Sequence, residues 1–209
     1  MKRSDTPVRS ESAIRPLLRA FLRRSIPDIR QLIDEFWVPR TNERADVAVI
    51  CPDFIHGIEI KTARDTLKRL PRQAQAYARV FDWCTAAVAP QHRAAAVELL
   101  PSWWGVVEIE SAAGDVRFDI LRAPTLNTGI DPEIIVRLLW RDEAFAALRA
   151  IDVDASERAS RSLLWTELLE RVDPNQIRSL VRMALVNRDP SRARVQTRRF
   201  TQLADAVAP

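Results

Sequence analysis

The feature that most constrains the fold is a pair of short strand-like runs joined by a four-residue connection. Residues 44–50 and 55–61 are rich in β-branched residues and alternate in polarity, which is typical of strands. The connection, CPDF at 51–54, is typical of a type I turn, because Pro52 presets the backbone angle that the first central position needs. The segment therefore predicts an antiparallel β-hairpin.

The turn also sets which residues face each other across the hairpin. Counting outwards from its centre pairs Ile50 with Ile55, Ala48 with Gly57 and Asp46 with Glu59. Opposed residues have Cβ atoms about 4.5–5.5 Å apart, so two carboxylates would lie side by side, with Lys61 on the same face. Like charges in that position destabilise a sheet, and a divalent cation with oxygen ligands would neutralise them. The small Ala48 and Gly57 are expected to leave room for a substrate on that face.

A Glu-x-Lys pattern on a strand has an ordinary interpretation, a solvated face with an ion pair. Three observations favour a functional site. Asp46 lies upstream at hairpin register, and the face carries small residues. The chain also has only three lysines against 29 arginines. Where arginine is so strongly preferred, a strand lysine such as Lys61 indicates that a compact point charge was needed.

These residues carry a resemblance to a known enzyme superfamily. Asp46, Glu59-x-Lys61 and a following Gln73-x-x-x-Tyr77 resemble the PD-(D/E)xK nucleases, and the Gln-x-x-x-Tyr pair resembles their RecB-like branch. Ala45 stands where the proline of the motif's name would be. The segments 56–88, 101–109 and 137–149 are closer still to a family of uncharacterised bacterial proteins placed in that superfamily, so the resemblance covers most of the chain.

The resemblance implies a fold and a metal site. The fold would be α/β, a restriction-endonuclease-like core with a central mixed β-sheet flanked by helices, followed by a small C-terminal helical module. Asp46, Glu59 and the carbonyl oxygen of Ile60 would ligate Mg²⁺ or Mn²⁺. Glu35, in an expected strand over 32–38, would reach the metal or its surroundings; its alternative interpretation is an ordinary surface carboxylate.

The resemblance also implies catalytic roles. Lys61 would orient the attacking water or help to deprotonate it. Gln73 and Tyr77, one helical turn apart, would contact the scissile strand or support the metal ligands. Phosphodiester hydrolysis needs a positioned water, a Lewis acid and charge neutralisation at the phosphate, which this set supplies. The expected activity is metal-dependent hydrolysis of DNA.

A change of composition at 123–129 divides the chain, because strand patterns precede it and only helical patterns follow. We expect a nuclease-like domain over 1–124, a helical module over 125–190 and a basic flexible tail over 191–209. Asp131-Pro132, Ser160 and Asp173-Pro174 are typical of helix starts. The module has three candidate roles: DNA binding, packing against the nuclease domain, and docking of a partner protein.

The composition of the chain bears on its partners and on its cellular location. Net charge is +4 with a pI near 9.7, which is compatible with nucleic acid as a partner. The resemblance to nucleases favours DNA over RNA as that partner. Both ends of the chain are arginine-rich, and they would either contact phosphates or be solvated. The apolar runs are too short for a membrane span, no secretory segment is seen, and two cysteines provide no disulfide framework. The expected location is cytoplasmic.

Two rival functions remain open at this point. One is a nuclease-fold module that binds nucleic acid or a partner protein without cutting. The other is a helical, transcription-factor-like protein for which the α/β part is a scaffold. The complete set of Asp46, Glu59 and Lys61 argues against the first, since a binder has no need of opposed carboxylates.

Overall fold

The computed structural model of the chain describes residues 10–112 and 115–189, and these fall into two compact units separated after Ile130. The expected tail over 191–209 lies outside the described residues. The first unit continues past residue 124 because Asn127 anchors the following segment. Its side-chain amide donates to the carbonyls of Ala78 and Phe81 at 2.6 and 2.9 Å.

The first unit is built on a six-stranded mixed sheet whose spatial order follows the sequence. The strands are β1 (Gln31–Trp37), β2 (Arg44–Ile50), β3 (Ile55–Lys61), β4 (Trp83–Val88), β5 (Gly105–Ala112) and β6 (Asp115–Arg122). The pairs β1–β2, β2–β3 and β5–β6 are antiparallel, whereas β3–β4 and β4–β5 are parallel. Parallel neighbours need crossover connections, and the helices of this unit supply them.

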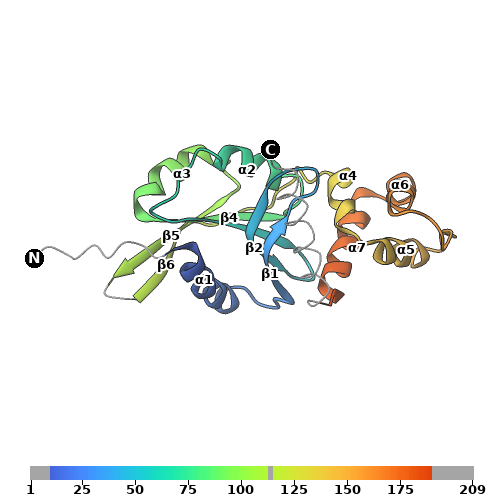
Figure 1. Cartoon of the computed structure of the whole chain (residues 1–209), viewed down its shortest axis with the longest axis horizontal. Helices are drawn as coiled ribbons and strands as arrows, with labels where there is room; N and C mark the ends of the chain where they lie inside the picture. Colours follow the sequence, from blue (N-terminus) through green and yellow to red (C-terminus); the bar gives the residue numbers. More distant parts are fainter. Residues whose placement is uncertain (1–9, 113–114, 190–209) are drawn as a thin grey trace, which may run out of the picture. The chain divides into compact units, whose positions relative to one another are not determined.

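Helices cover both faces of the sheet (Figure 1). The helix α1 (Glu11–Ser25) lies on one face, and α2 (Leu70–Tyr77) and α3 (Arg93–Leu99) lie on the other, α3 preceded by the 3₁₀ turn η1 (Pro90–His92). The apolar stripe of α1 is fully buried against the sheet. Its members are Ile14, Leu18 and Leu22 from the helix, which meet Val47, Val49, Ile58 and Ile60 from β2 and β3. An α/β fold with a mixed sheet flanked by helices is thus confirmed.

The hairpin register is also confirmed for Ile50 with Ile55 and for Ala48 with Gly57. The expectation that these small residues leave room for a substrate is wrong. A Cβ placed on Gly57 would lie 2.6 Å from the ring of Phe81, so the space above the glycine is filled by that side chain. A glycine inside a strand often marks such a close approach of another group. Here it allows the segment after α2 to pack directly on the sheet.

The second unit is helical. It consists of α4 (Pro132–Ile135), η2 (Val136–Leu138), α5 (Arg141–Arg149), α6 (Arg161–Arg171) and α7 (Pro174–Asn187). The predicted caps are confirmed, because Asp131, Ser160 and Asp173 each accept a backbone N–H from the first turn of a helix. Buried Leu and Ile residues form its core with Trp165, whose indole N–H donates to the carbonyl of Leu139 at 3.2 Å.

No helix among the described residues is long and apolar enough to cross a membrane.

Candidate functional site

Acidic residues of three adjacent strands stand at opposing positions of the strand register. The β1–β2 pairs on either side, Asp34 with Val47 and Phe36 with Ala45, place Glu35 opposite Asp46. Extending the β2–β3 register by one residue places Asp46 opposite Glu59, as the sequence predicts. The ladder between β2 and β3 ends just before this point. Asp46 and Glu59 therefore lie just beyond the last paired residues, Val47 and Ile58.

Asp46 occupies the middle of this row and is the most perturbed acid of the site. Its Oδ2 accepts the backbone N–H of Ile60 at 2.6 Å. Burial, and secondly the negative charge of Glu59, raise the pKa of Asp46 from 3.8 to about 8, although the hydrogen bond from Ile60 and the charge of Lys61 oppose the rise. A carboxylate that is costly to ionise in the folded protein is typical of functional sites, where a cation offsets the cost.

The carboxylate of Glu59 accepts hydrogen bonds from three side chains. Lys61 Nζ lies 2.5 Å from Glu59 Oε1, and Gln73 Nε2 donates to the same oxygen at 2.6 Å. The hydroxyl of Tyr77 donates to Oε2 at 2.5 Å. Glu59, Lys61 and Gln73 are 2–4% exposed and Tyr77 is fully buried, so this network is desolvated. Among the described residues, Gln73 Oε1 has no hydrogen-bond partner.

Gln73 and Tyr77 lie one turn apart on α2, and the start of this helix sets their position beside Glu59. Pro71 stands in its first turn, a position that tolerates proline, and the helix starts at Leu70. The Tyr77 hydroxyl also lies 2.5 Å from the carbonyl oxygen of Arg44, so its one proton is shared between that oxygen and Glu59 Oε2. The Tyr77 ring stacks on Trp104 with centroids 5.6 Å apart. Burial and then Glu59 raise the pKa of Tyr77 well above its usual value, so its hydroxyl remains a donor. The helix therefore supports the Glu59 carboxylate.

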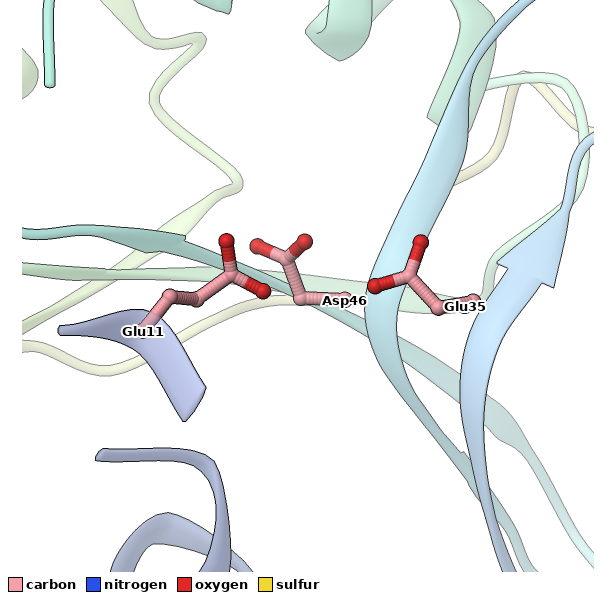
Figure 2. A group of neighbouring side chains, drawn as sticks. All are labelled: Glu11, Glu35 and Asp46. Carbon is pink, nitrogen blue, oxygen red and sulfur yellow. The ribbon is translucent and has the colours of Figure 1, made fainter. Parts of the chain in front are cut away.

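A second acidic cluster lies on the α1 side of Asp46 (Figure 2). One carboxylate oxygen from each of Glu11, Glu35 and Asp46 lies within 4.8 Å of the others. Figure 2 shows Asp46 between Glu11 of α1 and Glu35 of β1, with the three carboxylates turned towards one another. The guanidinium of Arg15 contacts both Glu11 and Glu35.

Glu35 has an unusual backbone conformation. Its φ is 52°, a left-handed value that a residue with a Cβ rarely adopts. Such conformations cost of order 1–3 kcal/mol and cluster at functional sites. The strain coincides with the position opposite Asp46, and the Glu35 side chain is thereby turned into the acidic cluster.

The structure thus brings together Asp46, Glu59, Lys61, Gln73 and Tyr77, and it places Glu35 beside Asp46. Ile60 takes part through its N–H, while the metal-binding role of its carbonyl stays a prediction. Sequence reasoning missed Glu11 and Arg15. Their spacing, i and i+4, is that of an ordinary solvated ion pair on a helix. Only the packing of α1 on the sheet brings them to Asp46.

Fold and site define an α/β protein with a desolvated acidic centre on its sheet, and sequence comparison shows the family. The profile of the family described as Bacteriophage P4 protein cII matches residues 5–204. The chain therefore belongs to that family.

A curated relative is Protein cII of Enterobacteria phage P4, 28% identical over 157 residues. The alignment covers 75% of this chain and 59% of the relative, so the chain spans less than two thirds of that protein's length. No solved structure matches the chain. Neither name states an activity, so function has to be argued from the site.

Proposed function

We propose that this protein is a metal-dependent nuclease of the PD-(D/E)xK type, with a restriction-endonuclease-like core, that hydrolyses phosphodiester bonds in DNA. The observation that carries the proposal is the row of Glu35, Asp46 and Glu59 across three strands, with Lys61 paired to its last member. The desolvated, raised-pKa Asp46 at the centre supports it.

The donor set fits Mg²⁺ or Mn²⁺. Such ions prefer oxygen ligands, and carboxylate oxygens of Asp46, Glu35 and Glu11 lie within 4.8 Å of one another. Asp46 would hold the ion in common with Glu59 and the Ile60 carbonyl on one side, or with Glu35 and Glu11 on the other. When bound, the ion would polarise the phosphodiester and lower the pKa of a water.

The chain's own residues supply the remaining functions. Lys61 is fixed by its ion pair with Glu59, and an ammonium has further N–H donors that can hold an attacking water or a phosphate oxygen. Gln73 and Tyr77 donate to Glu59, so we assign them as positioning residues for that carboxylate. The resemblance implies two roles for these residues. Their contacts favour support of Glu59, a proposed metal ligand, over contact with the scissile DNA strand.

The test is cleavage of plasmid and linear duplex DNA with Mg²⁺ or Mn²⁺ and with EDTA. We expect metal-dependent cleavage by the unmodified chain and its loss in Asp46→Asn and Glu59→Gln, with the fold intact by circular dichroism. Glu110→Gln is the matched control, because Glu110 is an exposed strand carboxylate remote in sequence from the site. Cleavage that survives in Glu59→Gln would overturn the proposal.

A second candidate function is a nuclease-fold module that binds without cutting. This alternative is favoured by the hydrogen bonds and ion pairs that the acidic side chains already make without a metal. Glu59 already receives three donors, and Arg15 bridges Glu11 and Glu35. Calorimetric titration with Mn²⁺ in the presence of duplex DNA separates the two: a binding module takes up DNA but no ion at Asp46.

The helical unit gives little support to the transcription-factor-like alternative. Residues 131–189 contain nine arginines and eleven Asp or Glu residues, a net charge of −2. Nucleic-acid-binding domains are usually basic, because phosphate contacts dominate their affinity. Several arginines of this unit also lie over aromatic rings, among them Arg188 at 4.2 Å from the Trp140 ring centroid. Docking of a partner protein fits the unit better, since Leu163 and Met183 are exposed.

A further inference from the structure

The segment that connects β3 to α2, residues 62–69, carries a concentration of positive charge beside the candidate site. Arg64, Lys68 and Arg69 are all exposed, and among the described residues none of the three side chains forms an ion pair. We refer to the segment 62–69 as the basic loop and to these three residues as the loop cations. Arg72, in the first turn of α2, is different, because it pairs with the buried Glu43 at 2.6 Å.

Both ends of the basic loop are tied to the site. Lys61, directly before it, is ion-paired with Glu59. Gln73, in α2 four residues beyond the end of the loop, donates to the same carboxylate. The chain on either side of the loop is therefore fixed to Glu59.

The loop is also held in shape by its own hydrogen bonds. Asp65, its one acid, accepts from the N–H and the hydroxyl of Thr62 at 2.7 and 2.6 Å. Gln91 donates to the carbonyl of Ala63 at 2.8 Å, and His92 Nε2 lies 3.1 Å from the carbonyl of Thr62. The only acid is thus engaged within the loop, and little conformational entropy remains to be lost when a ligand binds.

The position of these cations is unfavourable for folding. Lys68 and Arg69 lie at the N-terminal end of α2, and the first turn of that helix contains no acidic residue. The N-terminal end of a helix carries partial positive charge, so an exposed cation there is repelled by the helix dipole. Residues that oppose the local electrostatics are expected at functional sites, and a bound anion would offset the cost of these cations.

We infer that the basic loop binds the backbone phosphates of duplex DNA next to the scissile bond. The choice of ligand rests on the proposed function. The loop geometry does not depend on catalysis, so loop binding and cleavage can fail separately. Each phosphate neutralised by the loop releases counterions and makes binding depend on salt.

The test is a titration of fluorescein-labelled duplex DNA with the full chain, in EDTA, at several salt concentrations. The variant replaces all three loop cations by glutamine: Arg64→Gln, Lys68→Gln and Arg69→Gln. The matched control makes the same change of net charge at the exposed Arg23, Arg24 and Arg117. A further variant, Arg64→Lys with Arg69→Lys, keeps the loop charge.

We expect the loop variant to bind at least ten times more weakly, with a salt slope lower by about 2–3, since each duplex phosphate contact contributes about 0.9. The control and the lysine variant should bind almost as the unmodified chain does. Thermal unfolding of the loop variant should be unchanged or slightly higher, because cations leave the N-terminal end of α2, and this excludes misfolding as the cause.

Equal weakening in the loop variant and the control would show attraction by net charge only and would overturn the inference, as would unchanged binding in the loop variant. If cleavage is observed but the loop variant binds normally, the loop assignment fails and the nuclease stands. If the loop variant loses binding and no cleavage is found with any metal, the nuclease fails and the loop assignment stands.

Discussion

The substitution Asp46→Asn tests the effect of the negative charge of Asp46 on stability, because it removes the charge and keeps the size of the side chain. The pKa of Asp46 is raised from 3.8 to about 8, first by burial and then by Glu59. Asparagine has nearly the same volume and can accept the Ile60 N–H through its side-chain oxygen, but it cannot ionise. The substitution therefore removes an unfavourable charge and keeps the hydrogen bond.

The sign and size of the effect follow from proton linkage. Because the folded pKa lies above the unfolded one, Asp46 takes up a proton on folding between the two values. Its contribution to stability is complete below the unfolded pKa and is lost as pH rises through the folded one. At about 1.4 kcal/mol per pH unit, the unmodified protein loses up to about 4 kcal/mol from this group between about pH 5 and pH 8. The variant does not lose it.

We therefore expect the stability of Asp46→Asn relative to the unmodified protein to increase by about 2–4 kcal/mol over that pH range. The assay is urea unfolding in EDTA at about pH 5, 6.5 and 8, and the transition that moves with pH is the one compared, because the two units can unfold separately. Asp53→Asn, an exposed acid of the β2–β3 turn, is the control and should show no such trend.

Adding Mn²⁺ at about pH 8 should reverse the order, because an ion that binds only the folded state stabilises it in proportion to occupancy. The reasoning is refuted if the variant and the unmodified protein differ by a constant amount at every pH. It is refuted equally if the variant is less stable at pH 8 in EDTA, since that would mean that ionised Asp46 is not costly.

Three further perturbations test the structure. Tyr77→Phe keeps the ring but leaves a buried oxygen of Glu59 without its donor, so unfolding free energy should fall by about 1–3 kcal/mol in urea titrations; an unchanged midpoint would show that this contact is not made. Gly57→Ala drives a Cβ to 2.6 Å from the Phe81 ring and should cost roughly 1–3 kcal/mol, with partial recovery in a double variant carrying Phe81→Leu; full stability of the single variant would contradict the packing. Burial lowers the pKa of His56 to about 3, so its contribution is present above the unfolded pKa of 6.5 and is lost as pH falls towards 3. His56→Gln should flatten the acid side of the stability profile, and a profile of unchanged slope would show that His56 does not remain neutral.

Local patterns determined much of what could be predicted from the sequence. The hairpin register follows from the position of Pro52, because a turn of known length leaves one pairing. The helix starts at Asp131, Ser160 and Asp173 follow from side chains that satisfy the first N–H groups of a helix. These features depend on residues a few positions apart, which a sequence shows directly.

The parts that could not be predicted depend on contacts between distant segments. Glu11 reaches Asp46 only because α1 packs across the sheet. The small size of Gly57 led to the prediction of room for a substrate, whereas the ring of Phe81 from a later segment fills that space. Asn127 extends the first unit through two carbonyls near the end of α2, and no pattern in its neighbourhood indicates this.

The row of Glu35, Asp46 and Glu59 has a consequence for how this family can vary in length. Side chains alternate between faces along a strand, so one added residue inside β1 or β2 would send a carboxylate of the row to the opposite face. Insertions and deletions should therefore be rare within β1 to β3 among relatives that keep the three acids. Where length changes do occur there, they should come in pairs or be absorbed entirely by the connections at 38–43 and 51–54.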